Sequence, residues 1–286
     1  GKKTKKGYST NADVLEGLRG VHPAVDKVLR YRTLTKLRST YCEGLLKAIT
    51  ADGRIHSSFN QTETRTGRIS STEPNLQNIP VRTEEGKEIR QAFLPRAGWV
   101  LLDADYSQIE LRLMAHFSGD HALVEAFRTG QDVHARTASE IFDVPLDEVD
   151  STLRSRAKAV NFGLIYGISG FGLAKNTGVS RQEAQEFINR YFAKYPGVKG
   201  FMDSAAEDGQ HNGYALTLMG RRRYLPELKS DKAVVREFGK RAAMNTPVQG
   251  TAADIIKLAM VRVDEALRRE GLKLSLIHIS EPTRPY

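Results

Sequence analysis

The sequence predicts an α+β fold, because several long helical stretches are interrupted by a few short strands. Strands and helices do not alternate regularly, which argues against a doubly wound parallel sheet. The sequence also has no internal repeat. We therefore expect a mixed fold in which the strands are few and scattered among helices.

The N-terminal part is expected to be a helical appendage. A basic start at residues 2–6 precedes two helical segments within 10–49, which break at Gly20-Val21-His22-Pro23. Residues 53–80 are rich in Thr, Ser, Asn, Gln, Arg and Gly, with a short strand expected at 54–58 and an irregular polar stretch after it. Such a loop-rich segment is typical of a contact surface.

An apolar run at residues 99–102 predicts a buried strand from 99 to 105 that ends at Asp105. A carboxylate where a buried strand meets a helix is held rigidly, and carboxylate oxygens are ligands that a hard cation prefers. Asp103 would share one strand face with Asp105, so the two could not clamp metal ions from opposite sides. Asp105 is therefore the candidate metal ligand.

Downstream of this strand the pattern is mostly helical. Helices are expected at residues 108–117, 121–128, 133–142, 153–166, 181–195 and 198–211. A β-hairpin is expected over 214–225 with its turn at Met219-Gly220. Two further helices are expected near 232–243 and 248–269, with Pro247 in the first turn of the second.

Composition limits the kind of protein. The chain has 286 residues, 40% hydrophobic and 27% charged, which is enough for one large or two modest domains. Its 43 Lys and Arg against 34 Asp and Glu give a net charge of +9, which predicts attraction to a polyanion, although a basic balance also serves solubility. The single cysteine, Cys42, cannot form an internal disulfide, and no apolar stretch reaches the roughly 20 residues of a membrane span. No secretory signal is visible, so we expect a cytoplasmic protein.

The first group of chemically active residues is the hexapeptide Asp105-Tyr106-Ser107-Gln108-Ile109-Glu110. If the helix starts near Ser107, Glu110 points toward the same region as Asp105. Alternatively, the acidic residues only stabilise the positive end of the helix dipole.

The second group is a helical stripe at four-residue spacing, namely Arg154, Lys158, Phe162 and Tyr166. This spacing keeps the four on one slowly turning face, which extends about 18 Å at about 1.5 Å per residue. Cations bind phosphate oxygens and aromatic faces stack on a base or sugar, so the stripe describes a nucleotide site. Tyr166 lies between Gly163 and Gly167, which suits a hinge. Alternatively, the stripe is an amphipathic helix whose aromatic residues are core and whose cations face water.

The third group is Arg241, Asn245 and Gln249, again at four-residue steps. Amides and a forked cation can donate hydrogen bonds to minor-groove acceptors, which all base pairs present in similar positions. Alternatively, Asn245 or Thr246 only caps the N-terminus of a helix. This structural role is compatible with the functional one. Asp254 is expected on the helix surface.

Four motifs occur in order along residues 8–273. They are Thr66-Gly67-Arg68-Ile69-Ser70-Ser71 with Pro74-Asn75-Leu76-Gln77-Asn78-Ile79-Pro80, then residues 105–112, 154–167 and 241–254. Together they resemble family A DNA polymerases, the bacterial DNA polymerase I type. The resemblance implies a right-hand architecture, with an antiparallel palm sheet, helical fingers and a partial helical thumb. By this resemblance residues 1–50 form a thumb remnant, 51–118 and 231–273 the palm, and 119–230 the fingers with a connecting hairpin.

The resemblance also implies roles for individual residues. Asp105, with the backbone carbonyl of Tyr106, binds catalytic Mg²⁺, and Glu110 closes off the sugar 2′ position. The implied nucleotide-binding residues are Gln108, Glu110, His134, Arg154, Lys158, Phe162 and Tyr166, of which Lys158 also offsets charge on the leaving group. The implied DNA-binding residues are Arg68, Asn75, Gln77, Arg241, Asn245 and Gln249. Because Phe162 lacks a hydroxyl, discrimination against dideoxynucleotides is implied as well.

The implied reaction is an in-line attack of a primer 3′-hydroxyl on the α-phosphate of a deoxynucleoside triphosphate, with two Mg²⁺ ions and loss of pyrophosphate. The implied partners are primer–template DNA and deoxynucleoside triphosphates, without a membrane, and the chain is expected to be a monomer.

The sequence departs from the family pattern at its C-terminal side. The family's second catalytic carboxylate lies in a His-Asp-Glu sequence, which is absent from these 286 residues. Residues 274–286 resemble a translated sequencing adapter and are expected to be non-native. We therefore expect a polymerase fragment with weak or no activity. The alternatives are a non-catalytic duplex-binding protein of the same fold and, less favoured, a template-independent or RNA-copying enzyme.

Overall fold

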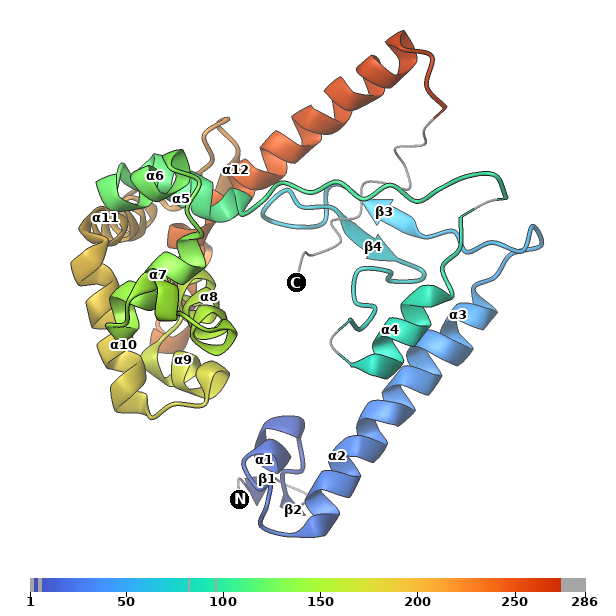
Figure 1. Cartoon of the computed structure of the whole chain (residues 1–286), viewed down its shortest axis with the longest axis horizontal. Coiled ribbons are helices and arrows are strands. Elements are labelled where there is room, and N and C mark those ends of the chain that lie inside the picture. Colours follow the sequence, from blue (N-terminus) through green and yellow to red (C-terminus); the bar gives the residue numbers. More distant parts are fainter. Residues whose placement is uncertain (1–2, 5–6, 82, 96, 274–286) are drawn as a thin grey trace. The chain divides into compact units, whose positions relative to one another are not determined.

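The computed structural model describes residues 3–4, 7–81, 83–95 and 97–273 (Figure 1). The described residues form two units. The first lies within Gly1–Glu63 and Ile69–Asp103, and the second within Thr64–Arg68 and Ala104–Ser280. The short loop Thr64–Arg68 thus belongs to the second unit although its neighbours on both sides belong to the first.

The first unit consists of helices and two small hairpins. Its elements are β1 (Lys3–Thr4), β2 (Gly7–Tyr8), α1 (Ala12–Glu16), α2 (Pro23–Lys36), the π-helix η1 (Leu37–Cys42), α3 (Glu43–Lys47), β3 (Ser58–Asn60), β4 (Ser70–Thr72) and α4 (Glu84–Gln91). The predicted break between two helical segments is confirmed, because Gly20 has a left-handed φ of +77° and Pro23 occupies the first turn of α2. From Pro23 to Lys47 the helical backbone continues through η1 (Figure 1).

The second unit contains most of the helices. Its elements are α5 (Ile109–Ser118), α6 (His121–Arg128), α7 (Val133–Phe142), the 3-10 turn η2 (Leu146–Glu148), α8 (Ser151–Ile165), α9 (Gly170–Thr177), α10 (Arg181–Lys194), α11 (Pro196–Asn212), β5 (Tyr214–Leu216), β6 (Arg222–Tyr224), the 3-10 turn η3 (Pro226–Lys229) and α12 (Ala233–Arg269). The helices predicted between residues 108 and 211 and the hairpin over 214–225 are confirmed, with ends shifted by a few residues.

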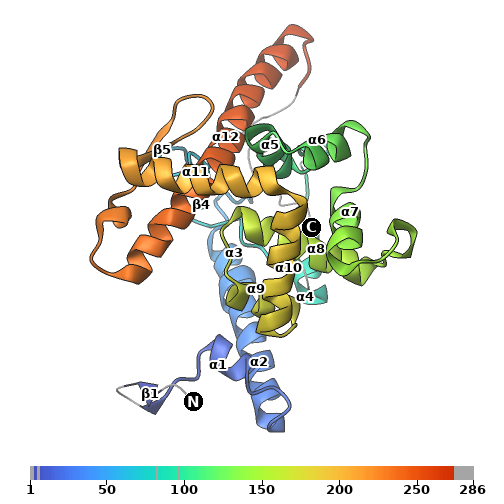
Figure 2. The same ribbon diagram turned by 90° about the vertical axis from the view of Figure 1, so that its left-hand side faces the viewer.

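Side-chain oxygens begin these helices. Asp120, Asp132, Asp150 and Ser180 each accept a hydrogen bond from a backbone N–H in the first turn of α6, α7, α8 and α10, respectively. α11 lies across α12, and α5 packs beside both (Figure 2). The main core joins these helices and includes Leu111, Met114, Leu123, Val160 and Tyr191. This packed body holds the start of α5, the end of α8 and the middle of α12 close together.

The buried strand expected at 99–105 is not observed. Residues 97–106 have no strand partner within the described chain, and Val100, Leu101 and Leu102 are largely exposed. A strand is stable only when a neighbour receives its backbone hydrogen bonds, and the described sheets are three antiparallel pairs, β1–β2, β3–β4 and β5–β6. The predicted α+β class is confirmed, but an apolar run does not by itself show that a segment pairs with another strand.

Two other local expectations are corrected. The strand placed at 54–58 begins instead at Ser58, and its partner β4 lies in the stretch expected to be irregular. The helices α4 and α9 were not expected, because both are only eight residues long and α9 contains two glycines.

The break expected at Pro247 is also wrong, because α12 runs without interruption from Ala233 to Arg269. Proline in a helix interior removes one backbone hydrogen bond and usually ends or kinks the helix. Here Thr246 and Val248 are buried where α12 packs against α5 and α11, so tertiary packing outweighs the local preference. None of the described helices is both long and apolar enough to cross a lipid bilayer.

Candidate functional site

A buried carboxylate connects four distant segments of the second unit. Glu110, in the first turn of α5, is 7% exposed. Arg68 donates a hydrogen bond from Nη2 to its Oε1, and the Tyr166 hydroxyl donates to its Oε2 over 2.6 Å. The side chain of Gln249 in α12 hydrogen-bonds to the same hydroxyl. We call Arg68, Glu110, Tyr166 and Gln249 the Glu110 cluster; all four are residues that the sequence singled out.

The partners satisfy the charge of this carboxylate. A buried carboxylate is costly unless paired and hydrogen-bonded, and both oxygens of Glu110 have a donor. Burial raises the pKa of Tyr166, and the adjacent Glu110 raises it further. Tyr166 therefore remains a neutral donor at neutral pH.

Glycine brings the end of α8 against α12. Gly167 follows Tyr166 with a left-handed φ of +67°, and a Cβ there would lie 2.8 Å from Cγ of Arg241. Such a distance leaves no room for any other residue. The stripe on α8 and the stripe on α12 therefore meet at Tyr166 and Arg241.

The cationic end of the α8 stripe faces α7. Nε of Arg154 lies 2.7 Å from Oδ2 of Asp132, and both side chains are nearly half exposed. Oδ1 of Asp132 accepts hydrogen bonds from the backbone N–H groups of His134 and Ala135. Lys158, one turn along α8, is half-buried. An exposed guanidinium held by one carboxylate can exchange that partner for a phosphate.

His134 lies below this surface rather than on it. The side chain is 2% exposed, and its Nδ1 is 3.1 Å from Nδ2 of Asn161. Burial lowers the pKa of His134 to about 4, so the imidazole is neutral at neutral pH. Its ring centroid is 5.6 Å from that of Phe162, which is half-buried against the main core. Phe162 packs on the core while Arg154 stays accessible, as the amphipathic-helix interpretation of the stripe expects, and the nucleotide site stays a prediction.

Gln108 begins α5 in an unusual backbone conformation. Its φ of +55° is left-handed, which is uncommon for a residue other than glycine and costs about 1–3 kcal/mol. Gln108 lines a cavity of about 240 Å³ together with Arg112, Phe127 and Asp132. The predicted nucleotide residues Gln108 and Arg154 are thus linked through Asp132.

The third stripe lies on one continuous helix. Arg241, Asn245 and Gln249 are on α12, and Oδ1 of Asn245 is buried without a hydrogen-bond partner among the described residues. A buried polar atom without a partner calls for an explanation, and a bound molecule is one.

Asp254 is a correction, because it was expected on the helix surface. Its side chain is 6% exposed and pairs with Arg221 at 2.6 Å. The apolar and small residues around Asp254 gave no sign of this partner, since Arg221 lies on the distant β5–β6 hairpin.

Asp105 and Tyr106 lie on the irregular segment that precedes α5, and both are exposed. A carboxylate and a carbonyl are hard oxygen donors, which suit Mg²⁺; this ion usually takes one or two carboxylates and completes its shell with water and phosphate. Within the described part of the chain, no group of three His, Cys, Asp or Glu residues is placed to hold a metal ion. The donors therefore fit a cation that is shared with a phosphate ligand.

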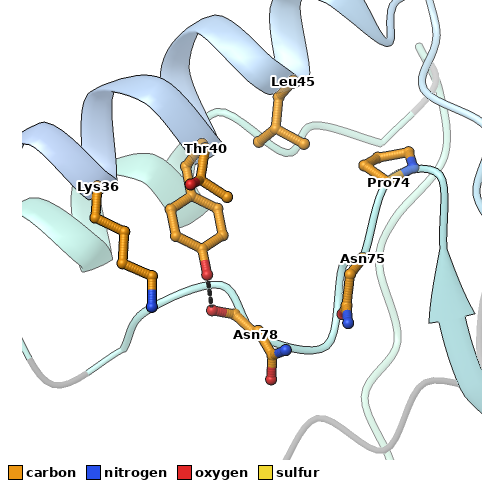
Figure 3. A pocket seen from close by; sticks show the side chains of 7 residues that line it. Lys36, Thr40, Leu45, Pro74, Asn75 and Asn78 are labelled. Carbon is orange, nitrogen blue, oxygen red and sulfur yellow. Dashed lines mark hydrogen bonds between the residues drawn. The ribbon is translucent and has the colours of Figure 1, made fainter. Parts of the chain in front are cut away.

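Asn75 and Gln77 belong to the first unit. Asn75 lines a cavity of about 570 Å³ whose other lining residues are Lys36, Thr40, Tyr41, Leu45, Pro74 and Asn78 (Figure 3). Tyr41 donates a hydrogen bond to the backbone carbonyl of Asn78. Gln77 donates to the carbonyl of Ile69 over 3.1 Å, so its amide supports the local backbone. Sequence reasoning missed Lys36, at the end of α2, and Tyr41, in the π-helix η1, because a π-helix has no signature in the sequence.

Comparison with known proteins places these residues in a family context. A family model described as DNA polymerase family A matches residues 1–279. The DNA polymerase I of Geobacillus stearothermophilus is 55% identical over 278 residues, which are 96% of this chain and 32% of that protein. The DNA polymerase I of Bacillus subtilis strain 168 is 54% identical over the same share of both chains. This chain therefore spans about a third of these relatives.

A solved structure agrees with the sequence comparisons. The POL domain of Pol1 from M. smegmatis, in complex with DNA primer–template and dNTP, superposes with a TM-score of 0.87 at 49% identity. The match covers 95% of this chain and 48% of that one.

Proposed function

The chain belongs to DNA polymerase family A, and from this membership we propose that it is part of a DNA-templated DNA polymerase that extends a primer 3′ end with deoxynucleotides. The observation that carries the proposal is the Glu110 cluster. The cluster contains two predicted primer–template contacts, Arg68 and Gln249. It joins them to two predicted nucleotide-binding residues, Glu110 and Tyr166. The primer–template and dNTP in the M. smegmatis complex support this reading.

The cluster suggests how a ribonucleotide is rejected. Both oxygens of Glu110 are occupied, by Arg68 and by Tyr166. Two donors hold the carboxylate in place, so a ribose 2′-hydroxyl brought against it would need room that this fixed side chain occupies, whereas a deoxyribose needs none. We infer that Glu110 closes off the sugar 2′ position.

The remaining predicted residues divide into those that bind the nucleotide and those that contact the primer–template. Arg154 and Lys158 bind the triphosphate with His134 and Gln108 beside them, Phe162 packs on the sugar, and Tyr166 lies at the template base position. Arg68, Asn75, Gln77, Arg241, Asn245 and Gln249 contact the primer–template.

Asp105 and the carbonyl of Tyr106 would hold Mg²⁺ together with the nucleotide phosphates. When bound, such ions lower the pKa of the primer 3′-hydroxyl and offset charge on the departing pyrophosphate. Lys158 and Arg154 neutralise charge on the same phosphates, and the packed α7–α8 pair fixes their spacing.

Duplex binding and primer extension test the proposal. The chain should bind a fluorescent primer–template by anisotropy, and Gln249→Ala should weaken binding by about tenfold through loss of a minor-groove hydrogen bond. Gln182→Ala, at an exposed position of α10, is the matched control and should leave binding unchanged. Failure of the unaltered chain to bind the duplex contradicts the proposal.

Extension with Mg²⁺ separates this proposal from the second candidate, a non-catalytic duplex-binding protein. We expect weak extension that Asp105→Asn abolishes. Duplex binding with no extension at any Mg²⁺ concentration would support the non-catalytic protein instead.

A further inference from the structure

The β5–β6 hairpin contacts both flanks of the Glu110 cluster. Gly67, next to Arg68, packs under the guanidinium of Arg221, where an added Cβ would lie 2.8 Å from Nε. Gly250, next to Gln249, packs against Thr217, where an added Cβ would lie 2.4 Å from Cγ2. Two glycines from distant segments therefore allow the backbone next to each predicted DNA contact to pack closely against the same hairpin.

A buried ionic network fixes the hairpin to α12. Nε and Nη2 of Arg221 both donate to Oδ1 of Asp254, at 2.8 and 2.6 Å. The Thr217 hydroxyl donates to Oδ2 of Asp254 at 2.7 Å and also accepts from the Arg221 backbone N–H at 3.0 Å. The backbone N–H of Leu218 donates to Thr251 of α12 at 2.9 Å. Because Asp254 is buried and Arg221 is its only ion-pair partner among the described residues, the guanidinium is held in one place.

The loop that carries Arg68 is held from the same side. Its Gly67 has a left-handed φ of +80° and donates its backbone N–H to the carbonyl of Thr64 at 3.1 Å. The Thr64 hydroxyl donates to the carbonyl of Arg68 at 2.5 Å. Arg65 pairs with Glu227 of η3, directly after the hairpin, at 2.6 Å. The loop is thus tied within itself and against the hairpin region, and it presents Arg68 to Glu110.

We propose that Arg221 and Asp254 are positioning residues that act through Arg68, setting its place opposite Gln249 and thereby the discrimination between paired and mismatched primer ends. The discrimination rests on the proposed function, since it requires Arg68 and Gln249 to contact the duplex. The mechanical part does not: when the Arg221–Asp254 pair is broken, the guanidinium leaves Gly67 and the loop loses its support.

Hydrogen exchange tests the mechanical part without DNA. Arg221→Lys keeps the charge but loses the planar fork, and Asp254→Asn keeps the volume but loses the charge. Each should raise the exchange rate of the Gly67 amide, which is hydrogen-bonded to Thr64, at least about tenfold through local opening. Arg136→Lys is the control, because it breaks another half-buried ion pair of the second unit, with Glu140 at 3.1 Å. Exchange in the loop that is unchanged in both variants, or raised equally by Arg136→Lys, overturns the proposal.

Duplex binding tests the functional part. We expect Arg221→Lys to reduce the ratio of Kd values for mismatched and matched primer ends, and to have no further effect in an Arg68→Ala background, because the two changes then remove the same contact. A merely structural role predicts equal weakening for both duplexes and additive effects, and that result overturns the proposal. If the unaltered chain binds no duplex, the proposed function fails, while the exchange experiment still decides whether Arg221 and Asp254 position the loop.

Discussion

At the scale of single residues, the stability of the buried Glu110 carboxylate depends mainly on the side chains that donate hydrogen bonds to it. The carboxylate is buried, and its two oxygens receive a guanidinium and a phenol from different segments. Removal of one donor leaves a buried acceptor unsatisfied, which costs more than the bond itself contributes.

Tyr166→Phe should lower the free energy of unfolding by about 1–3 kcal/mol, because Oε2 of Glu110 loses its donor. The loss should be smaller in a Glu110→Gln background, where no buried charge remains to be satisfied, giving a coupling energy of about 0.5–3 kcal/mol. Urea unfolding of the four proteins measures this cycle. Tyr224→Phe, at an exposed tyrosine, should change little, and additive losses at Tyr166 and Glu110 would argue against the bond.

His134 makes stability depend on pH. Its folded-state pKa is about 4, below the roughly 6.5 of an unfolded chain, so the unfolded chain takes up the proton first as the pH falls. The free energy of unfolding should therefore decrease between about pH 6.5 and pH 4, by about 2–3 kcal/mol from this residue.

His134→Gln should remove that part of the pH dependence even if it lowers stability at every pH. Urea unfolding at several pH values gives the slope, and His121→Gln, at an exposed histidine, should leave the slope as in the unaltered chain. Equal slopes for His134→Gln and the unaltered chain would show that the buried imidazole is not the cause.

At the scale of elements, α12 carries the third stripe on one uninterrupted helix. Pro247 has no backbone N–H, so the carbonyl of Ala243 lacks its usual helical partner. Local sequence therefore disfavours the helix at this point, whereas packing of Thr246 and Val248 favours it.

Pro247→Ala should raise the free energy of unfolding by about 1 kcal/mol, since the regained hydrogen bond exceeds the lost packing of the ring. Duplex binding should stay about the same, because α12 is already continuous through Pro247 and Gln249 keeps its position relative to Arg241. Thermal unfolding and anisotropy measure the two effects. Pro196→Ala is the control, because proline in the first turn of α11 removes no helical hydrogen bond. A lower stability, or clearly weaker binding, would contradict this account.

The helices from α5 to α11 could largely be predicted, because apolar periodicity and caps such as Asp132 and Ser180 are local signals. The strand at 99–105 could not, because pairing depends on a partner that the run itself does not specify. The continuity of α12 depends on burial against α5 and α11, which no window of sequence contains. Thus local signals predicted most of the helices, although not the short α4 and α9, and they did not predict the non-local contacts.

At the scale of the whole molecule, the net charge of +9 should govern how strongly the chain binds nucleic acid. Because cationic contacts release counterions from DNA, raising the salt from about 50 to about 200 mM should weaken duplex binding at least about 100-fold. Anisotropy titrations at several salt concentrations give the slope, with the free energy of unfolding measured at the same salts as a control. A flat dependence would indicate that phosphate contacts contribute little.

The sequence singled out individual candidate residues but not the network that joins them. The spacing of Arg154 to Tyr166 and of Arg241 to Gln249 identified the faces, and the structure brings Tyr166, Glu110, Arg68 and Gln249 into one hydrogen-bonded cluster. Sequence reasoning missed Asp132, Arg221 and Asp254, because their partners lie 22 or 33 residues away on other elements. No periodicity spans such separations.

The loop Thr64–Arg68 has a practical consequence for dissecting the protein, since it belongs to the second unit while its flanks belong to the first. Expression of residues 104–273 alone would keep every helix from α5 to α12 but omit Arg68. Glu110 would then be a buried carboxylate without its guanidinium, a loss that costs about 3–5 kcal/mol. The helical body therefore cannot be cut out as one contiguous stretch, and a peptide that contains the loop should restore it in a fragment-complementation experiment.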